Sequence, residues 1–288
     1  MKKIFFILLN IFLLNCLFAF DWPIEELSEE FYKSDFGQNI SGHISSSLIF
    51  NTTEQVKISE NGTILAVIQD YSDDTNFFPS TLGTAVIVAH EDNLLSVYGN
   101  IDKEKLYISS ENDYAVEKGQ HLGESGNSGW QEGLSTLEFQ IIDIKNSSAI
   151  NPKIMLSHLD SELPLTLSDI TLRNKKNEFF SLNDKKTFPT GIYKIYRKRN
   201  PVAVPYKTTV LVNGIEYDQI NYNILVEENG KICVIGKKRK YISEEVYPNE
   251  KLQLIGEVML SPGKTSLNLI VTDFLNKSRQ INYNLTIY

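Results

Sequence analysis

Histidine and cysteine are the side chains best suited to acid–base, nucleophilic or metal chemistry near neutral pH, and this chain has few of them. Its 288 residues include two cysteines, Cys16 and Cys233, and four histidines, His43, His90, His121 and His158. Cys233 lies in an alternating stretch, which predicts a buried and unreactive thiol within a strand. No P-loop or GxGxxG motif is present, and no serine or cysteine nucleophile has a convincing histidine partner. The chain therefore offers neither a recognisable nucleophile nor a nucleotide-binding loop.

Most of the chain consists of short alternating apolar stretches separated by turn sequences, a pattern typical of β structure. Asn-Gly pairs at 61–62, 213–214 and 229–230 predict tight turns. Only the acidic segment Pro23–Tyr32 has apolar residues at helical spacing. The predicted class is all-β, with strands at Gly62–Gln69, Thr84–Ala89, Leu94–Tyr98, Thr136–Ile142, Gly191–Tyr196, Thr208–Val212, Leu252–Leu260, Leu267–Thr272 and Gln280–Tyr288.

Charge is distributed unevenly along the chain. The total of 28 basic and 36 acidic side chains gives a formal net charge of −8, so no nucleic-acid partner is expected. Residues 20–158 contain 7 basic and 22 acidic groups, a net charge of −15, whereas residues 159–288 contain 19 and 14, a net charge of +5. We therefore predict two domains of opposite sign, at 36–158 and 163–288, after an acidic N-terminal segment at 20–35.

The first 19 residues have the pattern of a secretory signal peptide. Lys2 and Lys3 precede an apolar stretch too short for a comfortable membrane span, and Ala19 supplies a small residue for cleavage after Ala19 or Phe20. Export to the periplasm or cell envelope is expected. A second interpretation is a lipoprotein, because the residues up to Cys16 resemble a loose lipobox, and acylated Cys16 would be the only other membrane attachment.

Several blocks of residues occur in a characteristic order between residues 36 and 156. The most specific is the glycine-rich block Val116–Gly129, which follows Gly83–His90 and Leu95–Tyr98 and precedes Leu137–Ile141. Their order and spacing resemble the M23 (lysostaphin/LytM-type) zinc metallopeptidases, which cut peptide cross-links in peptidoglycan. The resemblance implies an antiparallel β domain of the LytM, or duplicated hybrid motif, type. The glycines themselves predict tight turns rather than chemistry.

The resemblance also implies where a zinc site would lie. Such a site has three protein ligands, from a His-x-x-x-Asp pair and the second His of a His-x-His, and an open position for an activated water. Two further histidines orient that water and stabilise the oxyanion. His43 matches the first ligand, but Ser47 replaces the aspartate and Glu138 the third ligand, while Thr136 and Asn100 replace the two catalytic histidines.

These substitutions predict a pseudoenzyme without a cofactor or metal. A neutral serine hydroxyl is a poor zinc ligand, and neither threonine nor an amide moves protons near pH 7. The function we expect is binding of peptidoglycan peptide or regulation of a cell-wall hydrolase. Two alternatives stay open: an active zinc endopeptidase with a rearranged metal site, and an envelope scaffold with no ligand. Of the other histidines, we expect His90 to make a structural hydrogen bond and His121 and His158 to lie on the surface.

The C-terminal region, residues 163–288, has about eight short strands at regular spacing, which predicts an Ig-like β-sandwich. Its final stretch, Leu260–Asn276, is similar to bacterial Ig-like modules, although Leu275 replaces an expected glycine. Two basic runs, Arg197–Arg199 and Lys237–Lys240, are predicted to lie in loops. Such runs either solvate hairpins or form a contact surface for an acidic wall polymer or partner.

Overall fold

The computed structural model describes residues 20–25, 31–52, 54–69, 80–108, 114–130, 135–157 and 159–288. The predicted signal peptide, Cys16 and His158 lie outside these ranges. The described chain is nearly all β, as predicted, and its α-helices, α2 (Pro152–Met155) and α3 (Ser243–Val246), are single turns. In the described ranges, no helix has the length and apolar character to cross a membrane.

The chain divides into two compact units by its internal packing. The first comprises residues 1–27, 51–139 and 152–159, and the second comprises 28–50, 140–151 and 160–288. Two segments that precede the predicted boundary, 28–50 and 140–151, thus pack with the C-terminal residues. The two units are described separately below.

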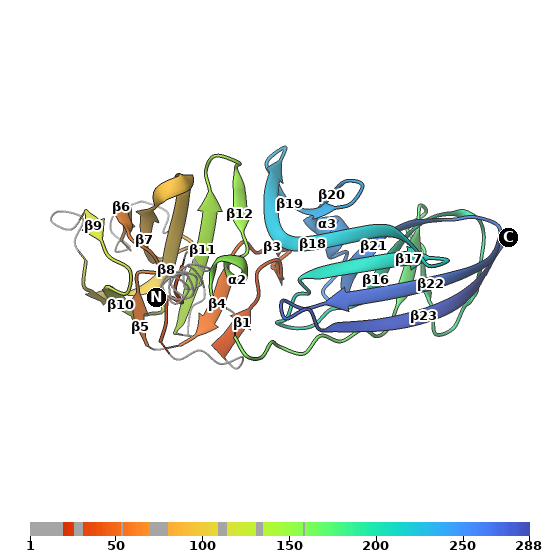
Figure 1. The fold of residues 1–288 in the computed structure, drawn as a ribbon, viewed down its shortest axis with the longest axis horizontal. Coiled ribbons are helices and arrows are strands. Elements are labelled where there is room, and N and C mark those ends of the chain that lie inside the picture. Colours follow the sequence, from red (N-terminus) through yellow and green to blue (C-terminus); the bar gives the residue numbers. More distant parts are fainter. Residues whose placement is uncertain are drawn as a thin grey trace, which may run out of the picture. The chain divides into compact units, whose positions relative to one another are not determined.

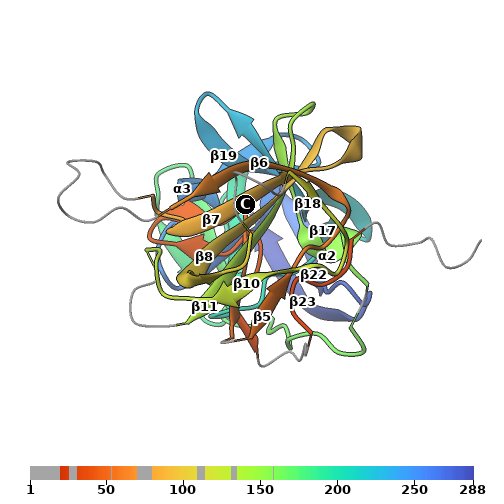
Figure 2. The same ribbon diagram turned by 90° about the vertical axis from the view of Figure 1, so that its left-hand side faces the viewer.

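The first unit is built on an antiparallel sheet. Strands β6, β7 and β8 pair in sequence order, and β9 pairs with β6. Strand β10 pairs with both β5 and β8, and Figure 2 shows β6, β7 and β8 side by side. The strands are β5 (Gln55–Lys57), β6 (Gly62–Ile68), β7 (Thr84–Ala89), β8 (Leu94–Leu106), β9 (Ala115–Val116) and β10 (His121–Ser125). Strand β11 (Thr136–Asp143) begins in this unit.

Close backbone packing explains the glycine-rich block in this unit. A Cβ at Gly126 would lie 2.5 Å from the Asp102 amide nitrogen, and one at Gly83 would lie 2.3 Å from the Ser128 carbonyl carbon. Gly83 also has a φ of +64°, a conformation that only glycine adopts without strain. These glycines therefore allow the turns to lie directly on β8, as the sequence predicted.

The second unit contains a two-layer β-sandwich. One layer has the strand order β14-β13-β16-β21, and the other runs β15-β23-β22-β17-β18-β19-β20 through successive pairings. Figure 1 shows β17, β22 and β23 side by side. The strands are β13 (Thr171–Asn174), β14 (Phe179–Ser181), β15 (Thr187–Phe188), β16 (Gly191–Lys198), β17 (Lys207–Val212), β18 (Ile215–Glu228), β19 (Lys231–Gly236), β20 (Lys240–Ile242), β21 (Leu252–Leu260), β22 (Gly263–Thr272) and β23 (Ser278–Ile287).

Alternating apolar residues of both layers form the sandwich core. Leu172, Ile195 and Val258 from the first layer are fully buried with Val210 and Leu269 from the second. The turns at Asn213-Gly214 and Asn229-Gly230 both have two residues with positive φ, as their sequence predicted, and they join β17 to β18 and β18 to β19. The predicted sandwich therefore follows from strand alternation and turn chemistry.

Two segments that precede the sandwich in the sequence complete the second unit. Strand β12 (Ser148–Ile150) pairs with β11 on one side and with residues 224–226 of β18 on the other. Strands β1 (Tyr32–Ser34) and β4 (Leu48–Asn51) pair with each other, and β2 (Asn39–Ile40) and β3 (His43–Ile44) form a small hairpin between them. Strand β12 thereby extends the second layer of the sandwich.

A polar contact fixes the start of the β2–β3 hairpin. The side-chain amide of Gln38, which is 2% exposed, donates to the carbonyl oxygens of residues 200, 201 and 202 at 2.9–3.2 Å. Its own oxygen accepts from Arg199 at 2.9 Å. Tyr247 donates to the Gly37 carbonyl at 2.6 Å. These groups are buried, so leaving any of them without a hydrogen bond would cost free energy of folding. The hydrogen bonds therefore fix the position of the hairpin on the sandwich.

Two predictions about local structure were wrong and one was confirmed. Arg197 is not in a loop: it lies in β16 and is fully buried, with hydrogen bonds to Thr166 and Gln253. Burial lowers its pKa to about 10. The second wrong prediction concerns length, since β8 continues to Leu106, well beyond the predicted Tyr98. Cys233 is buried in β19, as predicted. Half of the predicted helical segment Pro23–Tyr32, residues 26–30, lies outside the described ranges, and its last residue, Tyr32, begins β1.

A pair of glycines tests the packing of the β2–β3 hairpin on the sandwich. Gly37 and Gly42 both have positive φ (+83° and +87°), but a Cβ at Gly37 would lie 2.7 Å from the Tyr222 ring, whereas Gly42 has open space. We expect Gly42→Ala to cost about 1 kcal/mol from backbone strain, and Gly37→Ala to cost about 2–4 kcal/mol because overpacking is added. Thermal unfolding followed by circular dichroism measures both. Equal losses would contradict the predicted contact with Tyr222.

The carboxylate of Glu245 makes the stability of the sandwich depend on pH. Its burial would raise its pKa, but hydrogen bonds from Arg239 and Lys194 outweigh burial and lower the pKa to about 2. Because the folded pKa lies below the ordinary value of 4.5, this contribution is present above about pH 4.5 and is lost as the pH falls towards 2. We expect Glu245→Gln to be less stable than the parent at pH 7 and to lose less stability in acid. Urea unfolding at several pH values measures this, with exposed Glu227→Gln as the control; parallel profiles for Glu245→Gln and the parent would contradict it.

Candidate functional site

The five positions of the expected zinc site fall in both compact units. Asn100, Thr136 and Glu138 belong to the first, and His43 and Ser47 belong to the second. We therefore consider what each side chain does within its own unit.

Asn100 is the centre of a buried hydrogen-bond network in the first unit. It lies in β8 with a φ of +64° and is 1% exposed. Its amide nitrogen donates to the carbonyl oxygens of Gly126 and Thr136 at 2.8 Å and to the Thr136 hydroxyl at 2.6 Å. Its amide oxygen accepts from the Gly129 backbone at 2.7 Å. Every hydrogen-bonding atom of this side chain is thus used to hold the glycine-rich turn against β11.

Glu138 and Trp130 form a second polar contact nearby in the chain. The Glu138 carboxylate is 7% exposed and accepts a hydrogen bond of 3.0 Å from the Trp130 indole nitrogen. The Trp130 backbone nitrogen donates to the Thr81 carbonyl at 3.0 Å, while its ring is 44% exposed. The carboxylate therefore orients an aromatic ring that is open to solvent, which is a geometry suited to contact rather than to proton transfer.

Ser47 is held by its neighbours in the second unit. It is 2% exposed, and its hydroxyl oxygen accepts from the Gln140 side-chain amide at 2.9 Å. Its backbone nitrogen donates to the Ser45 hydroxyl at 3.2 Å. A hydroxyl oxygen placed in this way is engaged by an amide donor, and the neutral group offers no anionic ligand.

His43, which the resemblance matches to the first zinc ligand, is exposed on β3. The β2–β3 hairpin that carries it contacts α3 of the sandwich, where the Ser243 hydroxyl donates to the Gly42 carbonyl at 2.6 Å. The pKa of Glu244 in α3 is lowered chiefly by its hydrogen bond with Lys231, and His43 adds a smaller electrostatic contribution. The charged group that His43 influences is therefore Glu244, on the surface of the sandwich.

These residues do not fit a zinc ion. Structural zinc sites use four anionic or imidazole ligands and catalytic sites use three, but here the oxygen and amide groups at the expected positions already pair with other protein groups. Across the described ranges, no three His, Cys, Asp or Glu side chains are grouped so that they could hold a metal ion.

The other described histidines have the roles predicted from the sequence. His90 forms hydrogen bonds with the Asn61 carbonyl through Nδ1 at 2.8 Å and with the Ser96 hydroxyl through Nε2 at 2.7 Å. Burial lowers its pKa, although both nitrogens are engaged. His121 is exposed on β10.

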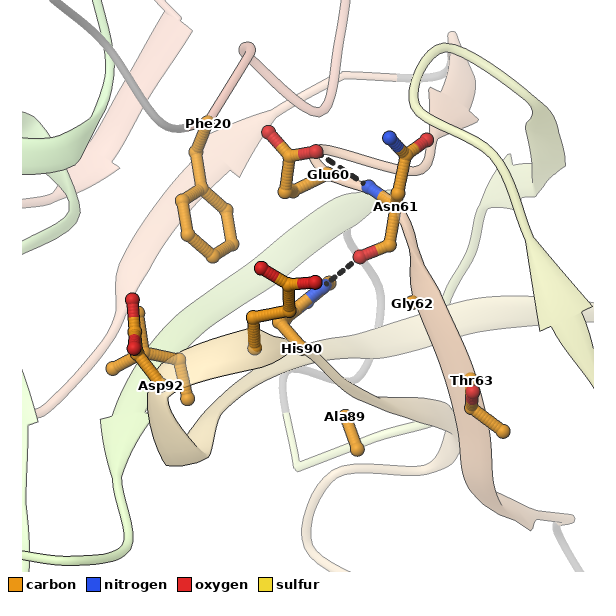
Figure 3. Close-up of a pocket in the computed structure, with 10 residues that line it drawn as sticks. Phe20, Glu60, Asn61, Gly62, Thr63, Ala89, His90 and Asp92 are labelled. Carbon is orange, nitrogen blue, oxygen red and sulfur yellow. Dashed lines mark hydrogen bonds between the residues drawn. The ribbon is translucent and has the colours of Figure 1, made fainter.

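His90 also forms the floor of a cavity of about 680 Å³ in the first unit. Figure 3 shows the Phe20 ring facing His90, and the two rings meet edge to face with centroids 5.0 Å apart. Phe20 is 1% exposed, and Glu60, Glu91 and Asp92 line the remaining wall. Both imidazole nitrogens of His90 already bond to protein groups, so this histidine is not placed to act on a ligand in the cavity.

Trp130 and Gln140 were not predicted as site residues from the sequence. Both lie directly beside family blocks, since Trp130 follows Gly129 and Gln140 lies within Leu137–Ile141. An isolated tryptophan immediately after a glycine-rich turn was the available signal, because glycine turns lie near the surface and a tryptophan there is often partly exposed.

The fold of the first unit is an antiparallel β domain, and across the described ranges it holds no group of side chains suited to a metal ion. Residues 43–152 match the model of Peptidase family M23, and this part of the chain belongs to that family. A second family model matches residues 164–288, which contain the predicted sandwich.

Other known proteins are similar to part of this chain in sequence or structure. An uncharacterized protein from Treponema pallidum (strain Nichols) is 30% identical over 122 residues, which are 40% of this chain and 80% of that protein. The solved complex of SpoIIIAH and SpoIIQ matches with a TM-score of 0.35 and 19% identity, over 46% of this chain and 96% of that one. A zinc-containing peptidase from Vibrio cholerae matches with a TM-score of 0.32 and 18% identity, over 43% and 36%.

Substitution of Asn100 tests whether this position is structural. We expect Asn100→Ala to lower the free energy of unfolding by about 2–4 kcal/mol, because it leaves buried partners unpaired and adds strain at positive φ. Asn100→Asp keeps the shape but replaces the donors with a charge facing two carbonyl oxygens, so a similar loss is expected. Trp22 and Trp130 are the only tryptophans and both belong to the first unit, so urea unfolding followed by tryptophan fluorescence reports on this unit.

The control for this measurement is His121→Ala on the exposed face of β10, which should change stability by less than about 0.5 kcal/mol. Losses below about 1 kcal/mol for both Asn100 variants would mean that the network contributes little, and the structural role assigned to Asn100 would then be wrong.

Proposed function

We propose that this chain is an exported cell-envelope protein whose M23 domain binds peptidoglycan peptide, or holds a cell-wall hydrolase, without hydrolysing substrate. The observation that carries the proposal is the saturated side chain of Asn100, which makes four hydrogen bonds within the protein at a position where the resemblance implies a catalytic histidine. Both polar atoms of this amide are bonded within the protein, and an amide neither gains nor loses a proton near pH 7, so it cannot replace an imidazole in moving protons to or from a reacting water.

Loss of catalysis follows from the chemistry of the remaining groups. Hydrolysis in this family type needs a metal-activated water and imidazoles that move protons. Here Thr136 and Asn100 replace both imidazoles, and proton transfer alone contributes about 10²–10⁴-fold to rate. Ser47 supplies a neutral oxygen already bonded to Gln140. The residual rate expected from such a site is negligible.

Binding is supported by the exposed ring of Trp130. An aromatic ring that is 44% exposed and is oriented by the Glu138 carboxylate offers apolar area at little entropic cost, because its indole nitrogen is already held. A peptide can pack against this ring without any change in the buried network beneath it. The domain can therefore lack hydrolytic activity and still bind a peptide through the surface around Trp130.

Export is the second part of the proposal and depends on the first 19 residues. Their basic start, apolar stretch and Ala19 support secretion to the periplasm or cell envelope. The burial of Phe20 against His90 favours cleavage after Ala19 over cleavage after Phe20, because the latter would remove a packed side chain. Lipid attachment at Cys16 would hold the same domain at a membrane surface.

Digestion of purified peptidoglycan sacculi tests the proposal directly. We expect the protein, with zinc supplied, to release no more soluble muropeptide than a buffer control, and we expect His43→Ala to behave identically. Zinc-dependent release that His43→Ala abolishes would overturn the proposal and establish the rearranged endopeptidase.

The same sacculi provide the binding measurement. We expect the protein to sediment with them, and Trp130→Ala to weaken this binding at least threefold. The matched control is Tyr107→Ala, which removes another exposed ring (53% exposed) of the first unit. If the protein neither sediments with sacculi nor recovers a hydrolase from envelope extract, the binding function is wrong and a scaffold is the better account.

A further inference from the structure

A basic hollow on the sandwich has no role in the function proposed above. It has a volume of about 350 Å³ and lies within the second unit. Its wall contains four cations and a single carboxylate, contributed by Arg173, Lys175, Lys194, Arg239 and Glu257, with Asn174, Asn177 and Ile192 completing it.

Strand register explains why these charges lie together. Arg173 of β13 pairs directly with Lys194 of β16, which pairs in turn with Glu257 of β21. Their neighbours in each strand, Leu172, Ile195 and Val258, are core residues, so by alternation the charged row occupies the opposite face of the sheet. Two cations directly opposite each other on neighbouring strands repel, and this arrangement is unfavourable unless an anion lies nearby.

Two carboxylates form ion pairs with two of these four cations. Glu245 accepts hydrogen bonds from Lys194 at 2.6 Å and from Arg239 at 2.8 and 2.9 Å. Glu257 accepts from Arg239 at 3.1 Å. These two carboxylates therefore neutralise Lys194 and Arg239, and they leave Arg173 and Lys175 as the uncompensated cations of the hollow.

Arg173 is held as a ligand-binding arginine would be. One terminal nitrogen donates to the Asn177 side chain at 2.6 Å, and its guanidinium lies 5.4 Å from the centroid of the Phe179 ring. Its Nε is buried and has no hydrogen-bond partner. Within the described part of the chain Arg173 makes no ion pair. A guanidinium fixed by these contacts keeps the planar fork geometry that recognises phosphate or carboxylate oxygens.

We propose that this hollow binds the phosphate group of a ligand, with Arg173 as the principal contact and Lys175 adding charge at the rim. The proposal also changes the interpretation of the basic runs in the sequence. Arg197 is buried and Arg239 is neutralised by two carboxylates, so neither of these members of the two runs offers a free charge. The charge assigned to the ligand in the hollow comes from Arg173 and Lys175, which belong to neither run.

Titration of the full exported chain with inorganic phosphate at constant ionic strength tests the site. We expect saturable amide chemical-shift changes in ¹⁵N-labelled protein at residues 173–177 and at Lys194. Arg173→Gln should weaken binding at least fivefold and Lys175→Gln about twofold to threefold, whereas Arg279→Gln, an exposed arginine of β23 outside the hollow, should have no effect. Lys175 lies in an exposed turn, so its variant provides the test even if Arg173→Gln does not fold.

A second arm distinguishes the source of the phosphate. A lipid headgroup is the ligand if the protein sediments with phosphatidylglycerol vesicles but not with phosphatidylcholine vesicles. Lys175→Gln and Arg173→Gln should then abolish this sedimentation. Saturable phosphate binding without vesicle sedimentation would identify a soluble or polymer-borne phosphate. The proposal would be overturned if the chemical-shift changes spread over all exposed cations and did not saturate with phosphate. They would then also be unchanged in both variants.

Discussion

The buried amide of Asn100 determines how the first unit is assembled. It connects β8, the glycine-rich turn and the start of β11 through four hydrogen bonds, and it is 1% exposed. Leaving any of these buried partners unpaired would cost more free energy than a bond contributes when formed. The glycines can lie close to β8 only because this amide satisfies the backbone groups that they bring together.

In the second unit, buried and paired arginine side chains hold the strands and the β2–β3 hairpin together. Three of its arginines have different structural roles: Arg197 is buried among neutral acceptors, Arg199 binds Gln38 at the β2–β3 hairpin, and Arg239 joins Glu245 and Glu257. Each of these roles uses the planar, multiply donating guanidinium, which lysine cannot reproduce. The hairpin that carries His43 is fixed by the same means, so this histidine is positioned by the sandwich.

The sequence predicted the elements of the fold better than their assembly. Strands Thr84–Ala89 and Leu252–Leu260 were predicted with their observed bounds, because alternation and flanking turn residues are local signals. The packing of residues 28–50 and 140–151 with the sandwich was not predicted, since no local pattern encodes a long-range pairing such as that of β12 with β18. Five site positions were located from the resemblance, but the hydrogen bonds of Asn100 and the role of Trp130 required the structure. The predicted domain boundaries stay a prediction.

The central claim is that the positions used for chemistry in family M23 serve structure and contact in this chain. Calorimetric titration of the metal-stripped protein with Zn²⁺, compared with His43→Ala, tests it most directly. The account predicts no stoichiometric site and the same weak heats for both proteins, because the serine, asparagine and threonine present do not form a zinc ligand set. One equivalent of tightly bound zinc in the parent protein that is lost in His43→Ala would contradict it.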